Sequence, residues 1–121
     1  MWTAWGKTLE EAVAQRWGVR LDTARAAIRL VRAARARGTP VRVTSGYRTP
    51  QAQSALYDAL PPGEAEPWNV SRHSREYPAT ALDFSGPAAE LVGLDRVATS
   101  AAGFHRALVH RGTGWHLHAE S

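Results

Sequence analysis

Apolar residues recur at helical spacing through the first part of the chain, between signals that start and stop helices. Thr8 and Glu11 form the pattern of a capping box, which predicts a helix over residues 9–17. Asp22 is placed to cap a second helix, whose apolar positions keep the same spacing until Gly38 closes it. The chain is therefore expected to begin with two consecutive helices.

Alternation of apolar and polar residues predicts strands in the rest of the chain, interleaved with helices. The last two strands flank a Gly-containing turn at residues 111–114, which is the strongest hairpin signal in the sequence. This order favours an α+β fold with a small, mainly antiparallel sheet and helices packed on one side. We expect strands over residues 41–44, 80–84, 104–110 and 115–119, and helices over residues 51–60 and 88–102, the last with a break near Gly93.

Length and composition restrict the class of protein. The 121 residues are too few for two hydrophobic cores, and 44% hydrophobic with 21% charged residues excludes wholesale disorder. The absence of cysteine excludes disulfides, thiolate zinc sites and cysteine nucleophiles. No apolar run approaches the ~20 residues of a membrane helix, and residues 1–7 do not have the pattern of a secretory signal.

The net charge is +4, from 15 basic and 11 acidic residues, and Lys7 is the one cation that is not arginine. Part of this charge forms a row on the second predicted helix, at Arg25, Arg29, Arg32 and Arg35. We interpret the row as a solvated helix face. Phosphate binding, and with it a nucleic-acid-binding domain, is the alternative, but it leaves the histidines unexplained.

Residues with metal-ligand chemistry gather in the second half of the chain. His116 and His118 are two residues apart on a predicted strand, so both side chains leave the same face. Asp83 interrupts an apolar strand, where a carboxylate is costly unless it is paired or binds a cation, although it could also cap the next turn. With His73, these residues offer a His, Asp, His set that fits a catalytic zinc with an open fourth position.

Arg48 stands between a predicted strand and a helix that begins with Thr49 and Pro50. This placement aims the guanidinium across the strand ends, where it can bind a carboxylate or a developing oxyanion. Considered alone, the position is typical of an ordinary surface arginine. Only together with the other motifs does it indicate an active site.

Three segments together resemble the zinc D,D-carboxypeptidases and the L,D- or D,D-endopeptidases of peptidoglycan. This group includes vancomycin-resistance dipeptidases and phage endolysins, and it shares its fold with the hedgehog signalling domain. The segments are Ser-Gly-Tyr-Arg-Thr-Pro at residues 45–50, Ser-x-His followed by Ala-x-Asp-Phe within residues 71–84, and Trp-His-x-His at residues 115–118. The resemblance implies one domain over residues 1–121, with a helical part over residues 1–40 and a zinc peptidase-like core over residues 41–121.

The resemblance implies a zinc enzyme that hydrolyses peptide bonds in the stem peptides or cross-links of peptidoglycan. It assigns Zn2+ to His73, Asp83 and His118. It also places His116 beside the metal, where it would hydrogen-bond substrate or intermediate. Arg48 would hold substrate or steady the oxyanion, and Ser71 would lie near the substrate.

Two departures from the family pattern affect this assignment. Nine residues lie between His73 and Asp83, where the family usually has six, and a loop can absorb the difference. The family's usual catalytic carboxylate, three residues before the last ligand, is replaced by Trp115.

Another group must therefore accept the proton of the attacking water. We expect His116 to matter most, Glu76 in the loop next, and Glu120, which shares the face of His118, least.

Two hypotheses follow from the motifs. The first is a wall peptidase, and the second is a catalytically silent member of the same fold that serves as a wall-binding or structural component of a phage particle. Without a secretory signal, the protein would stay in the cytoplasm until release, or travel on a virion, and act at the bacterial cell wall.

Overall fold

A computed structural model describes residues 8–111 and 114–121 of the chain. The sequence-based expectations for residues 1–7 and for the turn residues Gly112 and Thr113 lie outside these ranges. Within them, no helix has the length and apolar character needed to cross a membrane. The elements are the helices α1 (Leu9–Trp17), α2 (Leu21–Ala36), α3 (Pro50–Ala59), α4 (Ala88–Leu91) and α5 (Leu94–Ser100), and the strands β1 (Arg42–Ser45), β2 (Ala81–Ser85), β3 (Arg106–His110) and β4 (His116–Glu120).

The strands form one antiparallel sheet in the order β1-β2-β4-β3, which confirms the predicted α+β class. β2 and β4 are the central pair, and their register sets Asp83 opposite His118. Residues opposite each other in an antiparallel pair share a face of the sheet. The two residues singled out in the sequence therefore lie side by side on one face.

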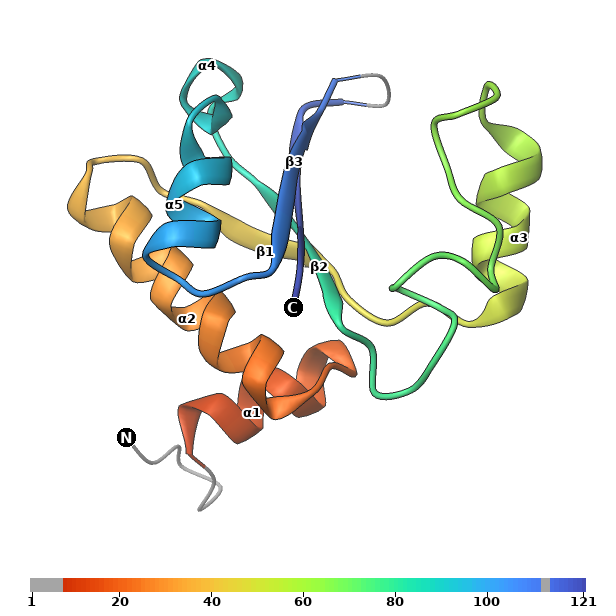
Figure 1. Cartoon of the computed structure of the whole chain (residues 1–121), viewed down its shortest axis with the longest axis horizontal. Helices are drawn as coiled ribbons and strands as arrows, with labels where there is room; N and C mark the ends of the chain where they lie inside the picture. The colour runs from red at the N-terminus through yellow and green to blue at the C-terminus, as the bar shows by residue number, and fades with distance from the viewer. Residues whose placement is uncertain (1–7, 112–113) are drawn as a thin grey trace.

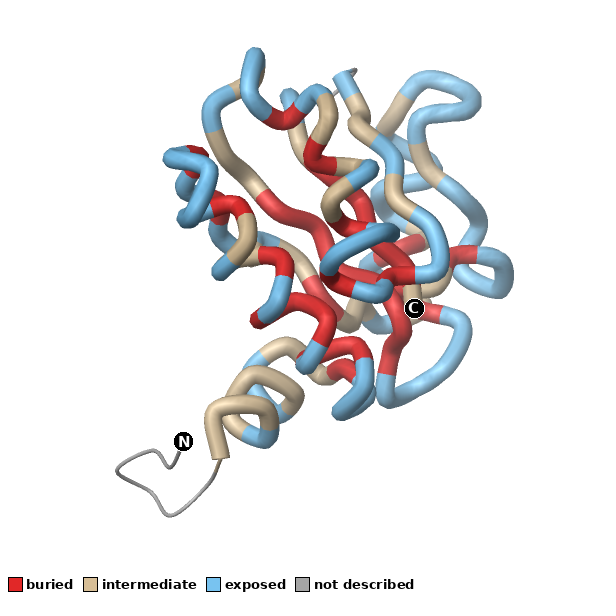
Figure 2. Tube along the Cα trace, turned by 60° about the vertical axis from the view of Figure 1, so that its left-hand side comes forward, coloured by how far each residue is buried: buried red, intermediate tan, exposed pale blue. Residues whose placement is uncertain are grey.

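The sheet divides the molecule into a packed side and an open side. Leu82, Phe84 and Leu117 are fully buried on the packed side, which α2, α4 and α5 cover (Figure 1). Figure 2 shows the buried residues running along the strands and along the inner faces of these helices. α3 is the exception to the expected one-sided packing, because it stands beyond the opposite face of the sheet (Figure 1).

Two of the three predicted helix caps are confirmed. The hydroxyl of Thr8 accepts the amide of Glu11 at 3.1 Å, and that of Thr49 accepts the amide of Ala52, also at 3.1 Å. The cap predicted at Asp22 is wrong, because α2 begins at Leu21 and Asp22 lies within its first turn. An aspartate there still favours the helix through its charge near the amino end.

The arginine row of α2 lies at the surface, as predicted for a solvated face. Arg25, Arg29, Arg32 and Arg35 are all exposed. Of these, Arg29 also donates a hydrogen bond to the carbonyl of Ala102 at 3.2 Å, just beyond the end of α5.

The end of α1 and the residues just after it form backbone hydrogen bonds to two loops on the open side of the sheet, one after β1 and one before β2. The carbonyl of Trp17 accepts the amide of Tyr47 at 2.8 Å, next to the carboxyl end of β1. The residues after α1 pair with Ala79, which accepts from Arg20 and donates to Gly18, each at 2.9 Å. The amino-terminal helices thereby fix both loops relative to the sheet.

Gly46 provides a test of this arrangement, because a Cβ there would lie 2.2 Å from the carbonyl oxygen of Trp17. Gly46→Ala is expected to lower the free energy of unfolding by about 1–3 kcal/mol, the usual cost of overpacking. Denaturant unfolding measures the change. Ala36→Ser, at an exposed helix end, is the control and should stay within about 0.5 kcal/mol of the parent. Equal stability of Gly46→Ala and the parent would contradict the described contact between α1 and this loop.

Candidate metal centre

Ligand atoms of His73, Asp83 and His118 meet on the open side of the sheet, as the sequence predicted. The Asp83 Oδ1 atom lies 3.3 Å from His73 Nε2 and 3.0 Å from His118 Nδ1, and the two nitrogens are 3.2 Å apart. Tetrahedral ligands about 2.1 Å from a zinc ion lie about 3.4 Å from one another. The three atoms are therefore spaced almost as the corners of a zinc site.

Two of these residues come from the sheet and one from a loop. Asp83 and His118 are cross-strand neighbours on β2 and β4. His73 lies in the segment between α3 and β2, where the amide of Arg48 donates to its carbonyl at 2.7 Å. The extra residues expected between His73 and Asp83 project outward, since residues 75–78 are exposed and the chain becomes buried again at Ala79.

A second hydrogen bond fixes the ring of each histidine. His73 Nδ1 lies 2.7 Å from the carbonyl oxygen of Gly46, and His118 Nε2 lies 2.8 Å from a carboxylate oxygen of Glu120. A carbonyl and a carboxylate only accept, so these nitrogens carry the protons. The lone pairs of His73 Nε2 and, once it is deprotonated, His118 Nδ1 are thus available to a metal. Such outer partners are typical of metal-bound histidines.

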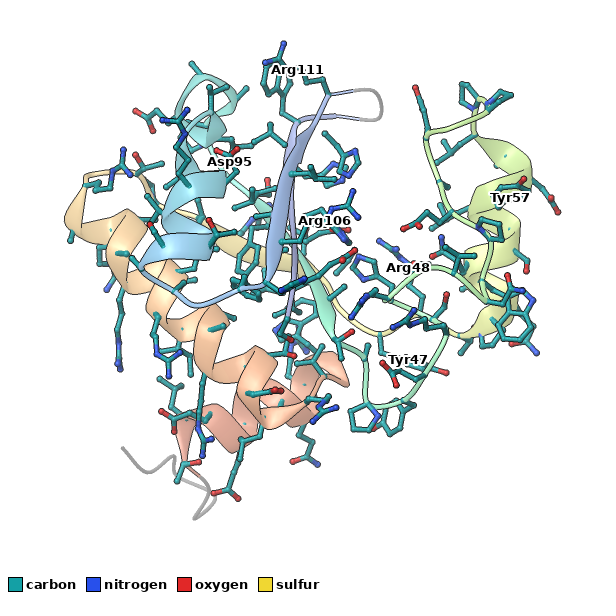
Figure 3. All side chains as sticks on the ribbon, viewed as in Figure 1. Tyr47, Arg48, Tyr57, Asp95, Arg106 and Arg111 are labelled. Atoms are coloured by element: carbon teal, nitrogen blue, oxygen red, sulfur yellow. The ribbon has the colours of Figure 1, made fainter. Side chains whose placement is uncertain are left out.

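The remaining oxygen of Asp83 is also occupied. Arg48 donates from one terminal nitrogen to Asp83 Oδ2 at 3.0 Å, and from the other to Gln53 Oε1 at 3.2 Å. Arg48 therefore points into the same region as the proposed ligands, as the sequence predicted, and lies between β2 and α3 (Figure 3). The role that the structure shows for Arg48 is to orient the proposed ligand Asp83 and to balance the negative charge of that carboxylate.

Buried charges at the centre shift the pKa values of its groups. Burial alone would raise the pKa of Asp83, but the hydrogen bond from His118 and the close approach of the His73 ring outweigh it and hold that pKa well below its ordinary range. Burial would lower the pKa of His118, but the carboxylates of Asp83 and Glu120 raise it above its ordinary value. A cation is thus favoured at this point, either as a proton on His118 or as a metal ion.

The centre opens into a cleft of about 520 Å3 between the sheet and the region of α3. Ser71 and His116, both predicted near substrate, line this cleft. The buried hydroxyl of Ser71 accepts the amide of His73 at 3.3 Å, so it also positions a ligand. The Nδ1 of His116 donates to the carbonyl of Gly114 at 3.0 Å, which leaves its Nε2 as a proton acceptor.

The two carboxylates considered as proton acceptors lie in different surroundings. Among the described residues that line the cleft, Glu76 is absent, and its side chain is exposed on the outward loop. Glu120 lines the cleft but is buried, with one oxygen on His118 and the other 3.6 Å from Arg72. The structure thus shows Glu120 as an orienting partner of His118 and Glu76 away from the centre, while the expected order of the proton acceptors stays a prediction.

Sequence reasoning gave no role to His110, which stacks on His116 with ring centroids 5.0 Å apart. Burial, with the nearby imidazoles of His116 and His118, lowers the pKa of His110 and favours its neutral form. The predicted turn at residues 111–114 carried no signal for this pair, because it would set His110 opposite Trp115, whereas the observed register sets it opposite His116.

Comparisons with known proteins assign no family to the chain. No model of a known protein family matches it, and no curated protein matches it. Conclusions about function therefore depend on the site.

Glu120→Gln tests the outer shell of the centre. The dissociation constant for zinc should rise about 10–100-fold, the usual cost of losing a partner of a metal-bound histidine. Loss of the Glu120 charge should also lower the pKa of His118, so the decline of zinc affinity on acidification should begin at lower pH than in the parent, from a weaker affinity at neutral pH. Competition with a chromophoric chelator across a pH series measures both effects.

Glu76→Gln is the matched control, because the same change is made at an exposed carboxylate away from the cleft. Its zinc affinity should equal that of the parent at every pH. If Glu120→Gln behaves like this control, Glu120 does not hold a metal ligand.

Proposed function

We propose that the chain is a zinc-dependent peptidase that hydrolyses peptide bonds in peptidoglycan stem peptides or cross-links. The observation that carries this proposal is the convergence of two imidazoles and one carboxylate, each held by an outer partner. Two histidines and a carboxylate are a ligand set of catalytic zinc sites, which keep one position open for water or substrate.

The described residues around the centre support hydrolytic chemistry. A zinc ion bound there would polarise a peptide carbonyl and activate water for attack. His116 lines the cleft with Nδ1 held by the carbonyl of Gly114, so Nε2 of the neutral imidazole can take a proton from the attacking water and pass it to the leaving amine. Arg48 orients Asp83 through its ion pair with Oδ2, and its remaining N–H groups can bind a substrate carboxylate or oxyanion.

The shape of the cleft and the sequence motifs support a peptide of the cell wall as substrate. The cleft is walled by the sheet on one side and by α3 with its following loop on the other, so an extended peptide can lie along it. The motifs at residues 45–50 and 115–118, which resemble those of wall peptidases, both contribute side chains to the cleft.

A catalytically silent member of the fold, acting as a wall-binding or phage-particle component, is the second candidate. One observation favours it. In the described part of the chain, Glu120 is the one carboxylate besides Asp83 that is hydrogen-bonded to a proposed ligand, and its two oxygens already contact His118 and Arg72. Trp115 stands where a catalytic carboxylate is expected, with the guanidinium of Arg111 4.6 Å from its ring.

Hydrolysis of purified peptidoglycan by the parent protein separates these candidates, and His116→Ala tests the proton transfer. If His116 transfers the proton, its loss should slow hydrolysis of purified peptidoglycan about 10²–10⁴-fold. Zinc affinity should change little, because His116 is not one of the three converging ligands. Turbidity and mass spectrometry of the released peptides follow the reaction.

His105→Ala is the control, since His105 is an exposed histidine outside the cleft lining, and its rate should match the parent. A parent protein that binds zinc but releases no peptide would establish the silent module instead. Full hydrolysis by His116→Ala would remove His116 from the proton transfer.

A further inference from the structure

Gln53 is a buried amide that the proposed chemistry does not use. It is 2% exposed, although most of α3 is open to solvent. Its oxygen accepts from Arg48 at 3.2 Å, and its nitrogen donates to the carbonyl of Glu66 at 2.9 Å. Both ends of the amide are therefore satisfied, one toward the metal centre and one away from it.

The bond to Glu66 reaches the loop at residues 61–70, called here the wall loop. Gly63, Glu64 and Glu66 from this loop line the cleft opposite the sheet. The loop contains no helix or strand, and most of its residues are exposed. Its position therefore depends on a few bonds to the rest of the protein.

A second bond ties the same loop to the neighbourhood of the centre. The hydroxyl of Ser74, the residue after His73, donates to the carbonyl of Trp68 at 2.9 Å. The wall loop is thus attached at two points. One is Ser74, next to the proposed ligand His73, and the other is Gln53, which reaches Asp83 through Arg48.

We propose that Gln53 is a positioning residue that couples the wall loop to the metal centre, so that zinc binding orders the loop and the ordered loop favours zinc. The path runs from Asp83 through Arg48 and Gln53 to the carbonyl of Glu66. The inference rests on the metal site of the proposed function and not on peptidase activity.

The physical basis is shared orientation. A metal ion held by Asp83 would restrict the orientation of its carboxylate, and with it that of Arg48 and of the amide of Gln53. Each group that is already ordered reduces the entropy lost when the next one orders. Coupling between two sites is reciprocal, so an ordered wall loop must in turn raise the affinity for zinc.

The wall loop is also the part of the cleft that would contact a substrate on the side away from the sheet. Coupling would therefore make the second wall of the cleft more ordered in protein that carries its metal. A substrate peptide would meet a better-defined cleft in the zinc-loaded protein than in the protein without zinc.

Gln53→Glu tests the coupling because it separates the two ends of the side chain. The carboxylate still accepts from Arg48, but it replaces the donor to Glu66 with an oxygen that faces the carbonyl. Hydrogen exchange of the wall-loop amides, followed by mass spectrometry with and without zinc, is the readout. In the parent, zinc should slow this exchange by about fivefold or more.

In Gln53→Glu, exchange in the wall loop should be fast and should no longer respond to zinc, although the variant still binds the metal. Gln51→Glu is the matched control, because it makes the same change on an exposed position of the same helix. Its exchange should respond to zinc as in the parent.

Gln53→Met is a second variant, similar in size and uncharged, that loses both bonds. It should lose the exchange response and also bind zinc several-fold more weakly than Gln51→Glu. In a folded Gln53→Met protein, loss of the exchange response or weaker zinc binding supports the coupling.

The outcomes distinguish this inference from the proposed function. Zinc binding by the parent without any change in wall-loop exchange, or a full response in Gln53→Glu, overturns the coupling and leaves the metal site standing. A parent that binds no zinc overturns both. Zinc-dependent ordering without peptidoglycan hydrolysis overturns only the peptidase.

Discussion

The burial of the Asp83 carboxylate is the constraint around which the site is built. Asp83 is 7% exposed and lies between Leu82 and Phe84, which are fully buried on the opposite face of the central strand β2. An uncompensated charge there costs several kcal/mol, a large share of the ~5–15 kcal/mol by which a domain is stable. Two imidazoles meet one oxygen and Arg48 meets the other, so the carboxylate is balanced on both sides. The two imidazoles and the oxygen between them are also a set of atoms that could hold a metal ion.

The amino-terminal helices belong to this arrangement although they contribute no ligand. The end of α1 fixes the loop that carries Gly46 and Arg48, and the residues after it fix Ala79 just before β2. Gly46 then holds the ring of His73 through its carbonyl. A ligand from a loop is thereby positioned as firmly as the ligands from the sheet, which a site with defined metal geometry needs.

The sequence predicted the class of fold and most element positions, because period-2 and period-3.6 patterns are visible in it. The three converging residues were assigned through the resemblance of its motifs to those of wall peptidases. Sequence reasoning missed features that depend on register or backbone. A symmetric four-residue turn would have put His110 on the opposite face from His116, and a one-residue difference in pairing brings them together. The bond from His73 to Gly46 was missed because it uses the backbone carbonyl, which every residue carries. The orienting contact of Glu120 with His118 was also not predicted, because it depends on how the two side chains meet along β4.

X-ray absorption at the zinc edge on the purified, zinc-loaded protein tests the central claim most directly. The account predicts one zinc per chain with light-atom ligands at about 2.0–2.2 Å, and outer-shell scattering from two imidazoles. Asp83→Ala should abolish this spectrum, whereas His105→Ala should leave it unchanged. A zinc spectrum without imidazole scattering, or one that survives in Asp83→Ala, would contradict a metal centre at His73, Asp83 and His118.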